Sequence, residues 1–463
     1  MRILLLNPPG KQLYTRDYYC SKTSKANYCY HPVDLLILSG ILATEHEIKV
    51  IDCMAEELNG SQTLSQIEAF GPQVVIFLTG SVSWEEDEPF MREVKQLTQA
   101  IIIASGDVLL EDGAKRLQDY PVLDAIILDF TSTQILSWLR GERTANYDSL
   151  IYLEATGQVR HSGQRERGGE FSIEVPRHDL FPFKKYRYPF VKGTPFATIL
   201  TDYGCPYKCS FCVMPHLGYK TRPVANVLEE LRAVRQLGIK EIYFNDQTFV
   251  VNQKRGQALF KAMIEEGFNF GWVSFSRVDL VDEEYLRLMR QAGCHTLIFG
   301  VESGNDATLE RYHKGFTTAQ VERTFALCRS LNIDVVATYV FGLPGETAAD
   351  IKRTIAFALK LKCDYASFNV VVPRMGTQLR QEAVESGLVD PNELHMDQTG
   401  SFAVMGTDTI SAAELLALKD LAVKSFYLRP RYLLRRLLMI SSWFDLKNQL
   451  SEGWALINKI GEG

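Results

Sequence analysis

Two successive alternations of apolar runs with amphipathic stretches constrain the fold of this 463-residue chain more than any other feature. In the first alternation the apolar runs are residues 3–6, 48–51, 74–78, 101–104 and 125–128. The helical patterns that separate and follow them lie near residues 33–45, 61–70, 86–98, 111–118 and 131–140. Short β-rich runs that alternate with helices are typical of a parallel sheet covered on both faces. We therefore predict a doubly wound, Rossmann-like α/β domain over residues 1–140.

Small residues follow three of these predicted strands, at 7–10, 79–81 and 105–107. The carboxyl ends of the strands form the ligand-binding edge of a doubly wound sheet. Two interpretations stay open, because such residues either admit a ligand to the backbone or only make tight turns. Residues 18–30, which include four tyrosines, either face an active site from this domain or cover it.

A second alternation begins at residue 195. Its predicted strands are residues 197–202, 241–245, 272–276, 296–301, 335–341 and 366–372. Six βα units predict a full or partial TIM-type barrel over residues 195–384, with its active site at the carboxyl ends of the strands. Residues 141–194, punctuated by glycine and proline, are predicted as a linker with one hairpin. Residues 385–463 are predicted to be a helical C-terminal region that ends in a tail with Trp454 and Gly463.

Composition excludes several classes of protein. The 50 basic and 56 acidic residues give a formal charge of −6, which argues against a broad nucleic-acid-binding surface. No apolar stretch approaches the length of about 18 residues that a membrane-spanning helix needs, and no targeting signal is evident. The nine cysteines are an odd number in a long chain, which favours a reducing compartment over a disulfide scaffold. We therefore expect a cytoplasmic protein.

Three of the nine cysteines, Cys205, Cys209 and Cys212, fall within eight residues directly after the first predicted strand of the barrel. The spacing C-x3-C-x2-C gathers three soft ligands, which suit zinc or an iron–sulfur cluster. Three thiolates on a four-iron cluster leave one iron open to an external ligand. In the alternative, His216 completes a structural zinc site.

This cysteine spacing, with the aromatic Phe211 just before the third cysteine, resembles the radical S-adenosylmethionine (SAM) superfamily. The resemblance implies a [4Fe-4S] cluster on Cys205, Cys209 and Cys212, whose open iron binds the amino and carboxylate groups of SAM. It implies reductive cleavage of SAM to methionine and a 5′-deoxyadenosyl radical that abstracts hydrogen from an unactivated carbon. It also implies a small-molecule or peptide substrate and an electron donor such as a flavodoxin or ferredoxin.

Short segments after the later predicted strands resemble the same superfamily, in order. Asp246 and Gln247 stand where the family contacts the SAM amino group, and Glu302 suits the ribose hydroxyls. Residues 341–347 resemble the glycine-rich segment beside adenine and methionine. The SAM-binding residues that the resemblance implies are Phe211, Asp246, Gln247, Arg277, Glu302, Ser303, Gly342 and Glu346.

A doubly wound domain ahead of such a barrel resembles the radical SAM group that carries a cobalamin-binding domain. The opening residues 7–9 and the late segment 426–430 are similar to that group too. The resemblance implies cobalamin-dependent C-methylation of a biosynthetic intermediate. The chain departs from the pattern at two turns, because residues 107–110 and 128–130 replace the glycine-rich turns expected there, and it has no D-x-H-x-x-G string.

If cobalamin is absent, the resemblance implies a cobalamin-independent epimerase, dehydratase or dehydrogenase of natural-product biosynthesis. An epimerase needs a hydrogen donor, commonly a thiol, and Cys363 at the start of the sixth barrel strand is the candidate. A buried core cysteine is the competing interpretation of Cys363. The most distant alternative is a zinc-stapled binding protein without enzymatic activity.

Overall fold

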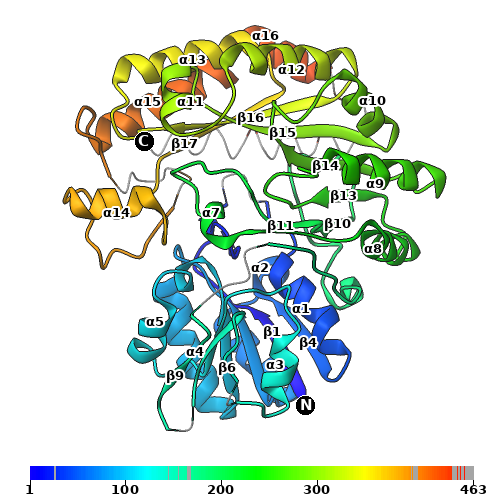
Figure 1. Ribbon diagram of the computed structural model, residues 1–463, viewed down its shortest axis with the longest axis vertical. Helices are drawn as coiled ribbons and strands as arrows, with labels where there is room; N and C mark the ends of the chain where they lie inside the picture. The colour runs from blue at the N-terminus through cyan, green and yellow to red at the C-terminus, as the bar shows by residue number, and fades with distance from the viewer. Residues whose placement is uncertain are drawn as a thin grey trace.

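The computed structural model describes residues 1–24, 28–143, 145–154, 156–163, 168–397, 399, 405–438, 440, 446, 449 and 453. Two β-sheets with their covering helices form two lobes, which lie one below the other in Figure 1. The first lobe is built on a sheet that starts at residue 2, and the barrel lobe on a sheet that starts at residue 196. The predicted α/β fold class, a doubly wound domain followed by a βα barrel, is confirmed.

The sheet of the first lobe has seven strands. Their order is β4 (Glu47–Asp52), β1 (Arg2–Asn7), β5 (Val74–Leu78), β6 (Ile101–Ser105), β7 (Ala125–Ile127), β8 (Leu150–Leu153) and β9 (Val159–Arg160). The first five strands are parallel, as predicted. The last two are antiparallel and belong to the hairpin that the sequence places in a linker. The hairpin continues the sheet because β8 pairs with the edge strand β7, so the sheet extends past residue 140.

Alternate side chains of each buried strand pack on opposite faces of this sheet. Ile3 and Leu5 pack on the face covered by α1 (Val33–Ala43) and α6 (Gln134–Leu139). Leu4 and Leu6 pack on the other face. The helices on that second face are α3 (Gly60–Phe70), α4 (Trp84–Thr98) and α5 (Gly113–Asp119). This burial on both faces explains why the strands read as unbroken apolar runs.

The barrel sheet has six parallel strands in chain order. They are β10 (Phe196–Ile199), β13 (Glu241–Phe244), β14 (Gly271–Ser276), β15 (Cys294–Glu302), β16 (Asp334–Phe341) and β17 (Tyr365–Val370). The outer helices are α8 (Val224–Gln236), α9 (Gln253–Glu265), α10 (Glu283–Gln291), α12 (Thr318–Ser330) and α13 (Ala348–Leu361), and a short α11 (Asp306–Arg311) follows β15. Within the described residues β10 does not pair with β17, so the barrel is partial.

Side-chain caps fix where several barrel helices begin. Asn252 accepts a hydrogen bond from the Arg255 amide at the start of α9, and Asp282 accepts one from the Tyr285 amide at the start of α10. Thr317 makes a reciprocal capping box with Gln320 at the start of α12. Each cap satisfies amides that have no partner inside the helix. Because each cap fixes the first residue of its helix, the loop between that helix and the preceding strand has a defined length.

The first predicted barrel strand, residues 197–202, is not continuous. After β10 the chain bends and forms β11 (Asp202–Gly204), which pairs antiparallel with β12 (Tyr219–Thr221). The bend is held by the buried Asp246 carboxylate, which accepts hydrogen bonds from the Thr201 and Asp202 amides at 2.6 and 3.0 Å. The break lifts the next residues away from the sheet and into the space between the lobes.

The C-terminal region contains α14 (Gln378–Glu385), α15 (Ala412–Tyr427), which packs on β17 and α13, and α16 (Pro430–Leu438). Between α14 and α15 the described residues contain no helix, so the predicted helical region is interrupted. The predicted tail with Trp454 and Gly463 lies outside the described residues.

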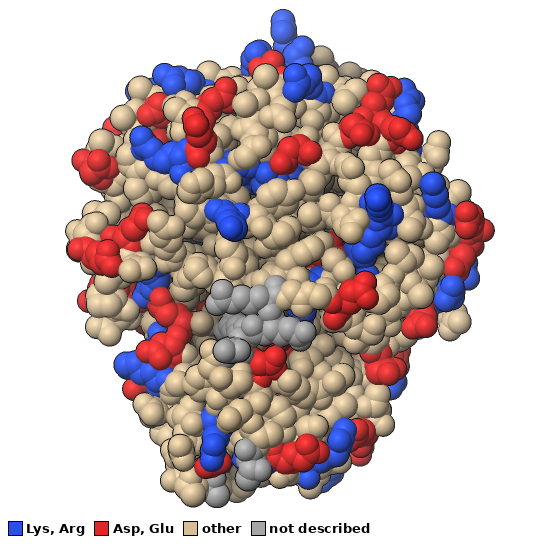
Figure 2. Space-filling model, in the orientation of Figure 1, with Lys and Arg blue, Asp and Glu red and all other residues tan. Residues whose placement is uncertain are grey.

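No helix among the described residues has the length and apolar character to cross a membrane. On the face shown in Figure 2, acidic and basic side chains are interspersed, as the small net charge of −6 suggests.

Candidate functional site

The three clustered cysteines lie in the loop between β11 and β12, at the mouth of the barrel. Gly204 ends β11 with φ 73°, and a side chain there would come within 1.9 Å of the Gly218 carbonyl oxygen. Glycine is therefore required for the two strands of this cysteine hairpin (residues 202–221) to approach each other. The Cys212 amide donates to the Cys209 carbonyl at 3.0 Å, which closes a tight turn between two of the thiols.

All three thiols are free of disulfides. Cys205 and Cys209 are 9 % and 8 % exposed, and Cys212 is half-buried. Burial raises the pKa of Cys205, and burial together with the other two thiols raises the pKa of Cys212 to about 12. Among the described residues no three His, Cys, Asp or Glu side chains already converge closely enough to hold a metal ion. The three thiols thus lie on one loop without converging on a common point. Their role as cluster ligands stays a prediction.

Two buried cations lie against the cysteine loop. The Arg277 guanidinium stacks 3.6 Å from the ring centre of Tyr207, between the first two cysteines. Asp279 and the Lys314 carbonyl hold Arg277 in place, at 2.9 and 2.6 Å. The Lys314 ammonium lies 6.0 Å from the ring centre of Phe211. Both cations sit where they would offset the negative charge of ionised thiols.

Glu302 ends β15 in an unusual backbone conformation. Its φ is 64°, in the left-handed region that favours glycine, and the pairing of β15 with β16 shifts register beside it. Its carboxylate forms an ion pair with Lys314 at 2.7 Å. A non-glycine residue held in this region is strained, and such strain gathers at functional sites. The sequence missed Lys314, because no motif surrounds it.

Glu346 holds the loop after β16. One carboxylate oxygen accepts the Gly342 amide at 2.9 Å, while Oε1 is buried without a hydrogen-bond partner. Burial raises the pKa of Glu346 to about 7. A buried oxygen without a donor is a natural place for a ligand's donor group.

Other predicted SAM-binding residues have structural partners. Asp246 is fully buried and clamps β10 to β13, whereas its neighbour Gln247 is half-buried. Ser303 is buried, and its hydroxyl lies 3.2 Å from that of Thr354. Gly342 faces the C-terminal region, because a side chain there would lie 2.5 Å from Leu415 of α15. The structure therefore does not bring Asp246, Ser303 or Gly342 into an open site.

Cys363, the predicted hydrogen donor, lies away from the cysteine loop. It precedes β17, at the amino end of the strand, whereas the predicted site is at the carboxyl ends. Six residues of extended strand separate these ends by about 20 Å. The thiol is 2 % exposed, and burial raises its pKa to about 12. Cys363 is therefore buried at the amino end of β17, and its role as hydrogen donor stays a prediction.

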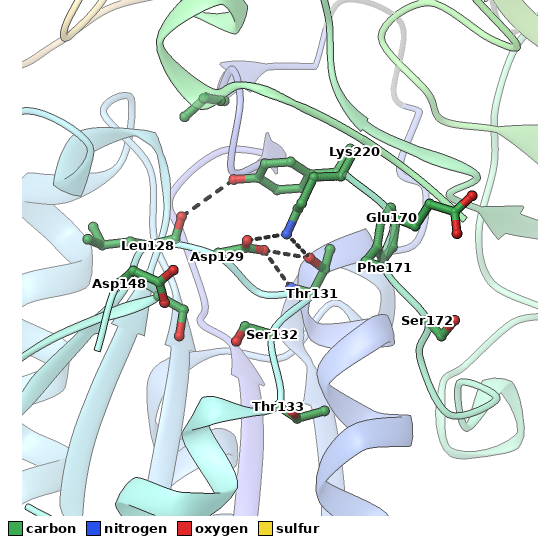
Figure 3. Close-up of a pocket in the computed structure, with 13 residues that line it drawn as sticks. Leu128, Asp129, Thr131, Ser132, Thr133, Asp148, Glu170, Phe171, Ser172 and Lys220 are labelled. Carbon is green, nitrogen blue, oxygen red and sulfur yellow. Dashed lines mark hydrogen bonds and ion pairs between the residues drawn. The ribbon is translucent and has the colours of Figure 1, made fainter. Parts of the chain in front are cut away.

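The cysteine hairpin is tied to the first lobe beside a cavity of about 160 Å³ between the lobes (Figure 3). Lys220 of β12 forms an ion pair with Asp129 and donates to Thr131 at 2.8 Å. Tyr203 of β11 donates to the Leu128 carbonyl at 3.4 Å. All three partners lie just after β7, so the carboxyl edge of the first sheet directly supports the hairpin.

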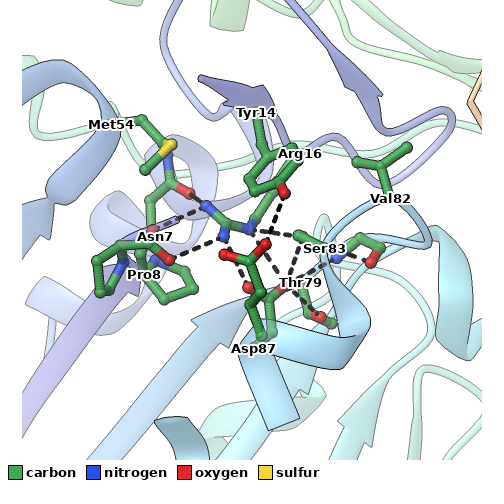
Figure 4. Close-up of polar contacts among 12 residues, drawn as sticks. Asn7, Pro8, Tyr14, Arg16, Met54, Thr79, Val82, Ser83 and Asp87 are labelled. Atoms are coloured by element: carbon green, nitrogen blue, oxygen red, sulfur yellow. Dashed lines mark hydrogen bonds and ion pairs between the residues drawn. The ribbon is translucent and has the colours of Figure 1, made fainter. Parts of the chain in front are cut away.

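A second hairpin covers that edge. β2 (Tyr14–Thr15) pairs with β3 (Lys22–Thr23), and we call residues 14–23 the edge hairpin. Arg16 in its loop enters the crevice between the ends of β1 and β5 (Figure 4). Its guanidinium donates to Asp87 at 2.6 Å, to Asn7 at 3.0 Å and to the Pro8 carbonyl at 2.8 Å. Neither side chain of the Arg16–Asp87 pair is exposed.

This crevice is the switch point of the doubly wound sheet, since β1 lies between β4 on one side and β5 on the other. Ligands of such sheets bind at this point. Tyr18 and Tyr19 of the edge hairpin extend the cover and lie 6.3 and 6.0 Å from the ring centre of Tyr203. The edge hairpin thus covers the carboxyl edge of the first sheet, and both predictions for the tyrosine-rich segment, that it faces or covers the active site, stay open.

Comparison with known proteins identifies the barrel. Residues 199–358 match the family described as the Radical SAM superfamily, a range that contains the cysteine hairpin, Arg277, Glu302 and Glu346. Residues 199–358 form a radical SAM domain. The prediction of a radical SAM enzyme is confirmed at this level, and the zinc-stapled alternative gains no support.

The radical SAM chain is similar to curated proteins along most of its length. A protein named an uncharacterized methyltransferase, from Pyrococcus horikoshii, is 29 % identical over 94 % of each chain. Cytidylyl-2-hydroxyethylphosphonate methyltransferase from Streptomyces wedmorensis is 25 % identical over 85 % of this chain and 83 % of its own.

Two solved radical SAM structures share the fold of both lobes. The methyltransferase TsrM from Kitasatospora setae, with cobalamin and a [4Fe-4S] cluster bound, matches with a TM-score of 0.70 and 17 % identity over 100 % of this chain and 99 % of that one. The cobalamin-dependent enzyme OxsB matches with a TM-score of 0.70 and 14 % identity over 97 % of this chain and 71 % of that one. At these identities the matches establish the fold.

Proposed function

We propose that this chain is a radical SAM C-methyltransferase of the cobalamin-dependent type. It cleaves SAM reductively, abstracts hydrogen from an unactivated C–H bond and delivers a methyl group to that carbon. The observation that carries the proposal is the match of both lobes to a methyltransferase structure with cobalamin and a [4Fe-4S] cluster bound. Two relatives whose names include methyltransferase support the transfer of a methyl group.

The chemistry of the cysteine hairpin fits an iron–sulfur cluster. Three soft ligands, Cys205, Cys209 and Cys212, stand on one tight loop with two cations beside it. When bound there, a [4Fe-4S] cluster supplies the electron that cleaves SAM to methionine and a 5′-deoxyadenosyl radical. Thiols with raised pKa values must release protons on binding iron. Arg277 and Lys314 favour that release, because they hold positive charge close to the loop.

Glu346 and Glu302 are the acceptors we propose for SAM. The unpartnered oxygen of Glu346 can accept a hydrogen bond from the ammonium or amine of a ligand. Glu302 keeps lone pairs for ribose hydroxyls while it is paired with Lys314. Phe211, Gln247 and Arg277 complete the contact surface that we propose, whereas Asp246, Ser303 and Gly342 shape it from behind.

Cobalamin does not fit the first lobe as it stands. The edge hairpin lies on the carboxyl ends of the strands, and Arg16 fills the crevice where a ligand would enter. A macrocycle needs close approach to that edge. Cobalamin dependence therefore requires the edge hairpin to move, and we derive no step through cobalamin.

Anaerobic reconstitution tests the proposal. The loaded chain should hold about four irons and, with dithionite and SAM carrying a trideuterated methyl group, form 5′-deoxyadenosine. Absence of 5′-deoxyadenosine would contradict radical SAM activity. Hydroxocobalamin should be retained through gel filtration, and a product that is 17 mass units heavier (CD3 replacing H) should appear when a substrate is supplied.

The closed edge favours a second candidate, a cobalamin-independent epimerase, dehydratase or dehydrogenase. Loss of all cobalamin on gel filtration, together with continued 5′-deoxyadenosine formation, would favour it over methylation. For either candidate we propose a flavodoxin or ferredoxin as electron donor and a cytoplasmic location. Nine free cysteines agree with a reducing compartment.

A further inference from the structure

A small cavity separates the mouth of the barrel from the edge of the first lobe. It is lined by residues from both lobes: Tyr19, Ser81, Asp107, Leu110, Val213, Arg374, Met375 and Met396. Val213 directly follows the third cysteine of the hairpin, so the cavity adjoins the cysteine loop. Its volume of about 10 Å³ is enough for about one water molecule or one oxygen atom of a ligand.

Arg374 enters this cavity from the loop after β17. The loop is held in place, because the Arg374 amide donates to the Val372 carbonyl at 2.9 Å and the Gly376 amide donates to Glu111 of the first lobe at 3.1 Å. The Arg374 side chain is 12 % exposed, and its Nη2 is buried without a hydrogen-bond partner. The hydroxyl of Tyr19, which is 1 % exposed and lines the same cavity, also has none.

The acid nearest to Arg374 does not satisfy it. Asp107 lies 3.7 Å from Nη1, beyond hydrogen-bond distance. Its two oxygens already accept the Ser21 and Ser81 amides, each at 2.8 Å, and both serine hydroxyls, the nearer oxygens being 2.8 and 3.1 Å away. Asp17, the other buried acid of this region, accepts the Tyr19 amide at 2.8 Å. Arg374 thus forms a long ion pair with Asp107 but keeps Nη2 as a donor without an acceptor.

We infer that Arg374 and Tyr19 form the subsite that binds an oxyanion of the substrate, a carboxylate or a phosphoryl group. A buried guanidinium donor without an acceptor is costly, and one oxygen of a carboxylate or phosphoryl group, for which the cavity has room, can satisfy it. The subsite lies next to the cysteine loop, so it would hold the C–H bond of the substrate close to the place where SAM is cleaved. Identifying the substrate class in this way rests on the proposed function.

Thermal unfolding of the anaerobic, cluster-loaded full chain tests the subsite. The probes are formate and acetate for the carboxylate, inorganic phosphate and methylphosphonate for the phosphoryl group, and formamide as the neutral control. A ligand that binds only the folded chain raises the unfolding midpoint saturably, and the concentration dependence gives its Kd. We expect one class of anion to do so, and Arg374→Gln to raise its Kd by about tenfold or more.

Arg353→Gln is the matched control, because this exposed arginine of α13 carries the same charge. It should leave the Kd unchanged. Should Arg374→Gln not fold, Arg374→Lys keeps the charge but loses the planar guanidinium and its Nη2 donor, and an intermediate Kd is expected. An equal Kd in the Arg374 variants and the control, an equal effect of formamide, or no saturable effect of any anion would overturn the subsite. Formation of 5′-deoxyadenosine on the same preparation is a separate readout, so either proposal can fail alone.

Discussion

The two lobes differ in how the polar groups at the carboxyl ends of their strands are paired. At the edge of the first lobe the guanidinium of Arg16 donates to side chains and carbonyls all around it, and Asp87 also accepts the Ser83 hydroxyl at 2.6 Å and the Thr79 hydroxyl at 2.9 Å. At the mouth of the barrel three thiols are free, and Glu346 and Arg374 each keep a buried polar atom without a partner. The crevice around Arg16 is thus filled by the chain itself, whereas the barrel mouth has groups that a ligand would satisfy.

The difference shows that a lobe can keep the fold of its relatives without keeping an open ligand site. Both lobes match solved cobalamin-dependent enzymes, yet Arg16 and Asp87 fill the crevice of the first lobe, whereas the barrel mouth keeps three free thiols and the unpartnered oxygen of Glu346. Fold alone does not specify function. Four substitutions test this contrast, and they follow in order of decreasing effect.

Removing one thiol should have the largest effect. Cys209→Ala takes away one of the three cluster ligands that we propose, so 5′-deoxyadenosine formation should fall to background, measured by mass spectrometry after reconstitution. Cys53→Ala is the control, because this buried thiol contacts only Thr63 of the first lobe among the hydrogen bonds described, at 3.2 Å. Undiminished formation in Cys209→Ala would remove the cluster assignment.

Breaking the closed edge should cost the first lobe much of its stability. Asp87→Ala leaves the Arg16 charge buried and unpaired, and we expect the free energy of unfolding to fall by about 3–5 kcal/mol in a urea titration. Asp179→Ala breaks an exposed pair with Arg177 and should cost less than about 1 kcal/mol. Similar losses in the two variants would show that the edge is not held by this pair.

The unpartnered carboxyl of Glu346 should give a pH-dependent effect. Burial raises its pKa from 4.5 to about 7, so the folded chain holds this proton more tightly than the unfolded chain does. Its stabilising contribution is present below pH 4.5 and is lost as the pH rises through about 7. Glu346→Gln should therefore resemble the native chain near pH 5 and be more stable by up to about 3 kcal/mol at pH 8.

Asp350→Asn, at the start of α13, is the control for this pH dependence. The Thr347 hydroxyl lowers the pKa of Asp350, so its contribution is present above the ordinary value of 3.8 and lost on acidification. The variant should lose stability at both pH 5 and pH 8. If Glu346→Gln shows the same difference from the native chain at both values, Glu346 is not the group that titrates.

The smallest effect is expected at Cys363. Because its thiol is buried at the amino end of β17, Cys363→Ala should change 5′-deoxyadenosine and product formation by less than about twofold. Stable radical formation with loss of product would restore the thiol as a hydrogen donor.

The sequence predicts most of the strands and the order of the two lobes, because buried parallel strands leave unbroken apolar runs. It also places Cys205, Cys209 and Cys212 on one loop, since their spacing is local. It could not predict that Arg16 reaches Asp87 or that Lys314 reaches Glu302, because these contacts join distant segments without a motif. At Gly342 the motif is local, yet the sequence could not predict that α15 lies beside it.

The anchoring of the cysteine hairpin has a consequence for how the protein matures. Lys220 and Tyr203 fasten the two strands of that hairpin to Asp129, Thr131 and the Leu128 carbonyl of the first lobe. A nascent chain makes the first lobe before the hairpin, so the support for the loop exists when the cysteines emerge. Iron loading would then depend on a correctly folded N-terminal lobe, and damage to that lobe would appear first as a shortage of iron in the barrel.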